Sequence, residues 1–291
     1  MFGSTLSHIT AEACVPEQLE HYVRSVSGRR AFLCGGYAAY AHAGHAVLVA
    51  YPLDAEAEAP GREAEPSLAG PLGELALSCS AVTVLAPFRP AEAPNSAPSS
   101  RDRYWDLPVP PRPGQKLRNM LKRAGREVAV EPEEWNEEHA ALVRHYLQTR
   151  PLAPGTRAIF TALPDYWARA AQAGAALLLF AARKKDGRLA AFSMGDYTAL
   201  RTAFYMFSFR HPDAPPGTAD LLLARLVEEA HARGHARMNL GLGINGGISF
   251  FKKKWHAEPG LPYVETSWEL SRTGKNAAGP GLFTRLGGLF R

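Results

Sequence analysis

The stretch Met238-Asn-Leu-Gly-Leu-Gly-Ile-Asn-Gly-Gly-Ile-Ser-Phe-Phe-Lys-Lys-Lys-Trp255 decides the fold of this chain. It combines a short apolar strand, a glycine-rich loop and a brief helix that is rich in aromatic residues and lysines. If the helix begins at Ile248, its 3.6-residue period places Lys252 on the same face as the apolar side chains. Lys253 and Lys254 then point into solvent. The pattern therefore predicts that one lysine of the three faces the protein body.

The composition is that of a globular protein. At 291 residues the chain has room for about two domains, and a hydrophobic content of 46% allows a sizeable core. The formal net charge of +5 suits anionic ligands but is too small to indicate nucleic-acid binding by itself. The three cysteines are scattered, as expected of free thiols in a reducing compartment, and the N-terminus lacks the pattern of a secretory signal. We therefore expect a cytoplasmic protein.

Prolines suggest a division of the chain into domains. They recur between residues 87 and 113, so regular structure is not expected there, and residues 101–114 are predicted to be a linker. Residues 1–100 then form an N-terminal domain and residues 115–270 a second one. The remaining segment, 271–291, is basic and apolar. A frayed terminus and a peripheral membrane contact are both open for it.

The second half of the chain shows a regular succession of predicted elements. Residues 115–126 form a basic helix that includes Lys122 and Arg123, and Thr218 is the predicted N-cap of a long amphipathic helix. Helices and strands in this order predict an α/β (α+β) domain with a mixed β-sheet flanked by helices. Strands are expected at residues 176–182, 188–197, 202–209, 236–240 and 262–270.

The first half carries weaker patterns. A helix is expected at residues 16–27, and strands are expected at 31–40, 46–51 and 75–86. Residues 54–70 are rich in alanine, glutamate, proline and glycine with no apolar period, so a loop is predicted.

From residue 176 onward, the order of elements resembles that of the GNAT-like acyltransferases. The motif Phe251-Lys-Lys-Lys-Trp255 is similar to the Phe-Lys-x-x-Trp that follows a strand and a small-residue loop in one branch of this superfamily. That branch includes the Fem peptidoglycan aminoacyltransferases and the catalytic part of lysyl-phosphatidylglycerol synthases. The likeness covers residues 113–270. It implies a tandem protein in which residues 1–100 are a degenerate first copy of the fold.

The resemblance implies transfer of an acyl or aminoacyl group from an activated donor to an amine or hydroxyl. Such chemistry needs a held carbonyl, hydrogen bonds to the developing oxyanion and a route for the proton of the acceptor. Asp196, near a strand end, is the candidate general base, and Tyr205 is the candidate proton donor to the leaving group. A purely structural interpretation is also open for both residues: Asp196 as a solvated carboxylate at a strand end, and Tyr205 as an aromatic core residue.

Four polar side chains are candidates for substrate binding, namely Asn239, Asn245, Lys252 and Arg210. The ammonium of Lys252 is predicted to emerge at the edge of the glycine-rich loop, where a substrate anion would sit. The alternatives are a lysine that extends along the helix to reach solvent, and an Asn245 that holds a turn. No metal site is expected, because the histidines and cysteines lack the spacing of a ligand set.

The implied donor is either acyl-coenzyme A or aminoacyl-tRNA. In GNAT enzymes that use acyl-coenzyme A, the loop before the long helix carries a glycine-rich pyrophosphate site at the helix N-terminus. Here residues 210–218 offer Gly217 and Thr218 but also prolines, which have no N–H to donate. This departure leaves aminoacyl-tRNA open. Lys122 and Arg123 are then candidates for contacts with donor phosphates, with a solvated helix face as the alternative.

Two functions are therefore open. The first is an acyltransferase whose acceptor is a small molecule or a lipid or cell-wall precursor, with tRNA as a partner if it carries the donor. The second is a non-catalytic binding protein on an acyltransferase fold that has lost its donor site, which the prolines before the long helix favour.

Overall fold

The computed structural model of the chain describes residues 3–53, 65–243 and 246–270. Three features predicted from the sequence lie outside these ranges. They are Asn245, most of the acidic segment 54–70, and the basic tail 271–291 with its membrane contact.

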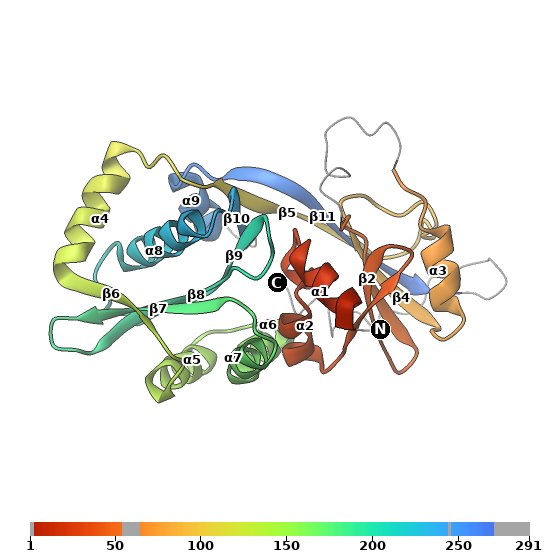
Figure 1. Ribbon diagram of the computed structural model, residues 1–291, viewed down its shortest axis with the longest axis horizontal. Coiled ribbons are helices and arrows are strands. Elements are labelled where there is room, and N and C mark those ends of the chain that lie inside the picture. Colours follow the sequence, from red (N-terminus) through yellow and green to blue (C-terminus); the bar gives the residue numbers. More distant parts are fainter. Residues whose placement is uncertain (1–2, 54–64, 244–245, 271–291) are drawn as a thin grey trace.

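Eleven strands of the described residues form one mixed sheet (Figure 1), in the order β1-β2-β3-β4-β11-β5-β10-β9-β8-β7-β6. The pairs β3–β4 and β9–β10 are parallel, and the other neighbouring strands are antiparallel. The strands are β1 Ala31–Cys34, β2 Tyr37–His42, β3 His45–Val49, β4 Ala81–Ala86, β5 Ser99–Pro108, β6 Val128–Glu133, β7 Leu177–Lys184, β8 Leu189–Asp196, β9 Thr202–Arg210, β10 Arg237–Leu242 and β11 Glu258–Glu269.

Helices cover both faces of the sheet (Figure 1). One face carries α1 Gly3–Ala11, the short η1 Pro16–Gln18, α2 Glu20–Ser27, α5 Glu137–Thr149, α6 Pro154–Thr161 and α7 Leu163–Gln172. The opposite face carries α4 Gln115–Glu127, α8 Thr218–Ala232 and α9 Gly246–Lys254 over the second half, and α3 Ala69–Ala76 over the first. Because helices lie on both sides, β8 is buried along its whole length, which explains its almost unbroken run of small and apolar residues.

The predicted fold class, a mixed sheet flanked by helices, is confirmed. The order of elements predicted from residue 176 onward is also present, with boundaries that differ by a few residues. Thr218 is not the N-cap of α8, however. Gly217 takes that position with a left-handed backbone of φ 87°, a conformation that glycine adopts with little strain.

The proline-rich segment contains regular structure, contrary to prediction. Residues Ser99–Pro108 form β5, which pairs with β10 on one side and with β11 on the other. Pro98 precedes this strand and Pro108 is its last residue, so no proline interrupts it, and Tyr104 and Leu107 are buried. The strand predicted at residues 75–86 is also different in the structure, where the end of α3 is followed by β4. The sequence showed no clear pattern for β6 and α6, and neither was predicted.

The two halves of the chain share one sheet and one core. β11 pairs with β4 from the first half and with β5, and so continues the sheet across the predicted boundary. One apolar cluster combines Ile9 and Tyr22 with Leu142, Tyr166 and Phe192. Burial of this cluster therefore requires both halves at once.

We predict that the fragment 115–270 does not fold cooperatively by itself. Without β4 and β5 it exposes the edges of β10 and β11, and without α1 and α2 it exposes the shared apolar cluster. Thermal unfolding followed by circular dichroism measures the result. The matched control is the chain truncated after Leu270, which keeps every described element. A sharp unfolding transition for the fragment would instead support two independent domains.

Candidate functional site

The candidate site lies where β9 and β10 part. Their parallel ladder covers three residue pairs and ends at Phe204 and Asn239, although β9 continues to Arg210 and β10 to Leu242. Beyond Phe204, β9 remains paired with β8 alone among the described strands. The two strands thus open a gap in the middle of the sheet.

The local cause of this divergence is a bulge in β10. Gly241 has φ 74°, and the pairing of β10 with β5 shifts between Asn239 and Leu242. Such a bulge bends its strand, and glycine permits the required backbone angle. The Gly241 N–H donates to Asn239 Oδ1 at 2.8 Å. Lys252 Nζ donates to the carbonyl oxygens of Gly241 at 2.8 Å and Leu242 at 2.6 Å, so two side chains hold the bulge in place.

A cavity of ≈ 430 Å³ occupies the opening between the strands. Residues 205–209 of β9, the β10 bulge and α9 form one part of its wall. The rest comes from α6, from Tyr146 of α5, from Ala219 in the first turn of α8, from Tyr104 of β5 and from residues 16, 17 and 22 near the N-terminus. The site therefore needs side chains from both halves of the chain.

Lys252 is a buried lysine in the wall of this cavity, with 2% of its surface exposed. The predicted inward phase of this residue is confirmed by its burial, but its ammonium does not emerge into solvent. Burial lowers the pKa of Lys252 to about 7, and the negative charge of Asp102 opposes this shift only in part. Lys252 can therefore gain or lose a proton near neutral pH.

Glu17 is a second buried ionisable group in the same wall. It belongs to η1, and Tyr104 Oη donates a hydrogen bond to its Oε2 at 2.8 Å. Burial raises the pKa of Glu17 to about 7, although the hydrogen bond from Tyr104 acts in the opposite direction. The cavity thus contains an acid and an amine that both titrate near pH 7.

Tyr205, predicted to protonate a leaving group, also lines the cavity. Its ring stacks on Phe251 of α9, with centroids 6.5 Å apart. Burial raises the pKa of the Tyr205 phenol, which therefore keeps its proton at neutral pH.

Asp196 was predicted to be a solvated carboxylate or a general base, and its surroundings indicate neither. It is fully buried outside the cavity wall, where its Oδ2 contacts His21 Nε2 at 2.6 Å and accepts a hydrogen bond from Tyr166 Oη at 2.8 Å. Burial alone would raise its pKa, but the hydrogen bond and the attraction of His21 outweigh this and hold the pKa below its usual value. We therefore assign Asp196 to the link between α2 and β8.

Of the other predicted substrate-binding residues, the two that the structure describes, Asn239 and Arg210, do not line the cavity. Asn239 is buried, and its Nδ2 donates to the Cys14 carbonyl at 3.1 Å while its Oδ1 accepts from Gly241, so both ends of the amide serve the fold. Arg210 is exposed at the end of β9. Asn245 lies outside the described residues.

The predicted donor-binding residues surround the N-terminus of α8, which fits a pyrophosphate poorly. A Cβ on Gly217 would lie 2.9 Å from Met120 Cγ, so α4 packs directly on this turn. The Thr218 hydroxyl donates to the Pro215 carbonyl at 2.6 Å. The first helical turn also contains the buried carboxylate of Asp220, which occupies this end of the helix with its own partners from α9. Lys122 and Arg123 are exposed on α4.

The lysines that follow Lys252 differ from each other, contrary to prediction. Lys253 is exposed and lies 5.9 Å from the centroid of the Trp105 ring. Lys254 is only partly exposed, and its Nζ lies 2.6 Å from Oδ1 of the buried Asp220. Trp255 Nε1 donates to the same oxygen at 2.9 Å. Asp220 thereby fixes the end of α9 to the start of α8.

We predict that Lys254→Ala lowers the free energy of unfolding by about 1–2 kcal/mol, because it leaves a buried carboxylate without its cation. Lys253→Ala is the matched control, and its effect should stay below about 0.5 kcal/mol, as for most exposed charges. Urea unfolding at pH 7 measures both. Equal effects from the two substitutions would mean that the ion pair with Asp220 contributes nothing.

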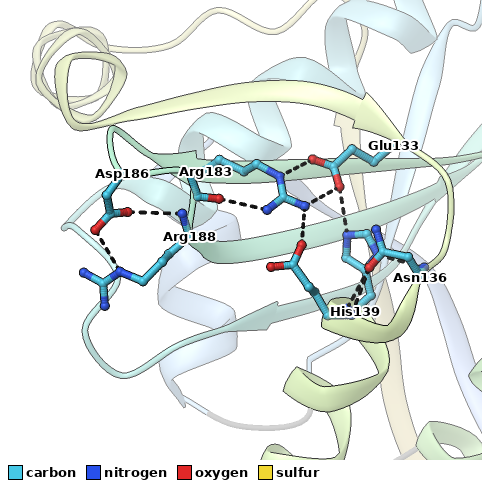
Figure 2. A network of polar contacts seen from close by, with 8 residues as sticks. Glu133, Asn136, His139, Arg183, Asp186 and Arg188 are labelled. Carbon is cyan, nitrogen blue, oxygen red and sulfur yellow. Dashed lines mark hydrogen bonds and ion pairs between the residues drawn. The ribbon is translucent and has the colours of Figure 1, made fainter.

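A second polar cluster, shown in Figure 2, lies on β6 and β7, the last two strands at one end of the sheet. Arg183 of β7 donates to both carboxylate oxygens of Glu133 on β6, at 2.6 and 2.8 Å, and to Glu138 of α5 at 2.6 Å. Asn136 caps α5, and the buried His139 accepts a hydrogen bond from the Asn136 N–H at 3.1 Å. None of these described residues lines the cavity, so we assign the cluster to the attachment of α5 to the sheet.

The described residues contain no group of three or more His, Cys, Asp and Glu side chains placed to hold a metal ion. They also contain no helix with the length and apolar character needed to cross a membrane.

Comparison with known proteins agrees with this geometry. Residues 114–253 match the family model described as an acetyltransferase (GNAT) domain. This segment therefore resembles a GNAT domain in sequence. The matched segment contains β9, β10, α8 and most of α9. It therefore includes the point where β9 and β10 part, the bulge in β10 and Lys252. No curated protein matches the chain in sequence.

Solved structures with the same fold span almost the whole chain. One is the C-terminal domain of a putative lysylphosphatidylglycerol synthetase from Agrobacterium fabrum, with 16% identity, a TM-score of 0.55, and coverage of 91% of this chain and 92% of that one. FemX has 9% identity, a TM-score of 0.57 and coverage of 91% and 95%. A tandem GNAT protein from the clavulanic acid biosynthesis pathway has 14% identity, a TM-score of 0.51 and coverage of 96% and 95%. At these identities the comparisons establish the fold alone.

Lys252 and Tyr205, predicted from the sequence as site residues, line the cavity, whereas Glu17 and Tyr104 were not predicted as site residues. Glu17 has Gln18 and Glu20 close to it in the sequence, so no local pattern marks it for burial. Tyr104 lies in the proline-rich segment that was predicted to be a linker. Glu17 and Tyr104 are 87 positions apart in the sequence, so no local pattern reveals their contact.

Proposed function

We propose that this protein transfers an acyl or aminoacyl group from an activated donor to an amine or hydroxyl acceptor inside the cavity between β9 and β10. The observation that carries the proposal is a buried, titratable lysine on the cavity wall of a GNAT-like domain, at the point where the two strands part. Glu17 and Tyr205 line the same cavity and supply the other groups that the reaction needs.

Lys252 is proposed to stabilise the oxyanion. Two of its N–H groups donate to the carbonyls of Gly241 and Leu242. In the ammonium form a third N–H remains, since a lysine ammonium has three. We assign this N–H to the carbonyl oxygen of the donor, on which negative charge develops during attack.

Glu17 is proposed to accept the proton. When an amine attacks, a new nitrogen–carbon bond forms, electrons move to the carbonyl oxygen, and the nitrogen becomes acidic. The Glu17 carboxylate takes this proton, and a pKa near 7 suits that task at neutral pH. The bond from carbon to the leaving group then breaks, and Tyr205 donates a hydrogen bond to the departing atom.

The donor site differs from the arrangement expected for coenzyme A. The N-terminus of α8 packs against α4 and is occupied by Asp220 with its partners from α9, which disfavours a pyrophosphate there. An acyl-coenzyme A would have to place its phosphates elsewhere, and the exposed basic face of α4 is the candidate. Aminoacyl-tRNA remains the second donor that we consider. The implied acceptor is a small molecule or a lipid or cell-wall precursor, as the likeness to the lysylphosphatidylglycerol synthetase and FemX folds suggests.

The test is a direct assay of transfer. Purified protein is incubated with acyl-coenzyme A thioesters and primary amines, and the amide product is measured by mass spectrometry. We expect product that depends on protein, donor and acceptor together. If donors or amines stabilise the protein against heat but no combination yields product, the alternative function, a non-catalytic binding protein, is favoured.

A tRNA-borne donor makes a separate prediction about α4. If Lys122 and Arg123 contact tRNA phosphates, the Kd for tRNA should rise at least about tenfold between about 50 and 200 mM salt. Replacing both residues with glutamine should then reduce the slope of log Kd against log salt by about 1–2. The exposed Lys185 and Arg201, replaced in the same way, are the controls. Salt-independent affinity would remove tRNA as the donor carrier.

A further inference from the structure

The lining of the cavity is more apolar than acyl transfer by itself requires. Away from Glu17 and Lys252, the wall includes Ile159 and Phe160 of α6 and Phe207 and Phe209 of β9. Phe160 packs edge-to-face on Phe209, with centroids 4.9 Å apart, and on Phe207 at 6.2 Å. These rings also belong to the apolar cluster that joins the two halves, so the wall is part of the core.

The size of the cavity argues against a small transferred group. A cavity of about 150 Å³ holds one benzene molecule, which corresponds to roughly 25 Å³ for each non-hydrogen atom. On this scale ≈ 430 Å³ corresponds to on the order of 15 non-hydrogen atoms. An acetyl group would occupy a small part of this space and would leave the aromatic wall without contacts.

The distribution of charge argues against a strongly polar occupant. Among the described residues that line the cavity, Glu17 and Lys252 are the only ones with ionisable carboxyl, amine or guanidinium groups. A phosphate or a second ammonium placed among the aromatic rings would lose its hydration and would meet hydroxyl groups, such as those of Tyr146, Thr156 and Ser208, but no opposite charge. Charged groups are therefore expected only at the reacting end of a bound molecule.

We infer that the substrate in this cavity is amphipathic, with an apolar chain or ring system of roughly a dozen carbons and a carbonyl or amine beside Lys252. The identity of the reacting group rests on the proposed function, whereas the apolar body rests on the cavity alone. The body can belong to the acyl group of the donor or to the acceptor, and the experiment below separates the two.

The test measures Kd at pH 7 for two series of probes, acyl-coenzyme A thioesters and primary alkylamines, with chains from about two to twelve carbons. Each methylene that enters an apolar cavity should tighten binding by about fourfold until the cavity is full. An affinity that increases with the length of the acyl chain assigns the apolar body to the donor. An affinity that increases with the length of the amine assigns it to the acceptor. Affinity independent of length in both series overturns the inference.

Two variants test whether the alkyl chains of the probes bind in the cavity or on the protein surface. Ala219→Phe places a ring in the cavity wall and should reduce the affinity for the longest probe by at least about tenfold. Phe250→Ser removes a ring that is 70% exposed and outside the cavity, and it should change nothing. Unchanged affinity in Ala219→Phe together with weaker affinity in Phe250→Ser would mean that the alkyl chains bind on the surface. If Ala219→Phe fails to fold, Met206→Trp fills the cavity from another wall.

The proposed function and this inference can fail separately. Length-dependent binding without any transferred product would refute the proposed transfer but leave the apolar substrate in place. Transfer of acetyl and decanoyl groups with equal efficiency, together with amine binding that ignores chain length, would refute the inference but leave the acyltransferase.

Discussion

Replacing Lys252 with methionine should lower kcat/KM by at least about 100-fold, the loss expected when one donor to a developing oxyanion is removed. Methionine keeps the length and the apolar stem of the side chain, so it preserves packing better than alanine. It also removes the hydrogen bonds to the carbonyls of Gly241 and Leu242, and a partial loss of stability is therefore expected. Kinetics must be measured below the unfolding temperature of the variant. Lys253→Met, on the exposed side of α9, is the matched control.

The pH profile separates a catalytic from a structural role of Lys252. Its ammonium loses a proton as the pH rises through about 7, so the activity of the unmodified protein should fall above that pH. The carboxyl of Glu17 becomes charged over the same range, so activity should also fall below about 7. The result is a narrow maximum near neutral pH. In Lys252→Met the decline above pH 7 should disappear, and its persistence would show that Lys252 only supports the bulge.

Replacing Glu17 with glutamine should lower kcat/KM by about 100-fold or more, because the acceptor then has no base to take its proton. Glutamine has nearly the same shape, and its amide oxygen can still accept the hydrogen bond from Tyr104. In the pH profile of the remaining activity of Glu17→Gln, the decline below pH 7 should disappear and the decline above pH 7 should persist. A profile that instead rises with pH would mean that neutral Lys252 is the base and Glu17 the acid, since both assignments give the same maximum in the unmodified protein.

Glu17→Gln should lower activity but raise the stability of the folded protein at alkaline pH. The pKa of Glu17 is raised in the folded protein, so its contribution to stability is present below its unfolded pKa and is lost as the pH rises through about 7. At pH 8 the buried carboxylate opposes folding, and Glu17→Gln should raise the free energy of unfolding by a few kcal/mol. At pH 4 the two proteins should be nearly equal. Urea unfolding at both values checks this, and a variant less stable at pH 8 would contradict the burial of Glu17 as a charged group.

Local patterns account for the part of the protein that was predicted correctly. The helical period of residues 246–254 placed Lys252 inward, and the succession of elements from residue 176 matched the observed strands and helices. Both features depend on neighbours within a few positions, where periodicity reports which face is buried. Lys254 shows the limit of this reasoning. Its helical phase was read correctly as different from that of Lys252, yet its partner Asp220 belongs to another helix.

The sequence by itself determined the mixed sheet flanked by helices and the inward face of Lys252, because the order of elements and the helical period follow from local spacing. The tertiary structure alone decided that Ser99–Pro108 is a central strand, that Asp196 serves the core, and that Glu17 and Lys252 share one cavity. The physical reason is that burial depends on what packs around a side chain. Glu17 and Lys252 titrate near pH 7 because elements from both halves of the chain exclude water from them.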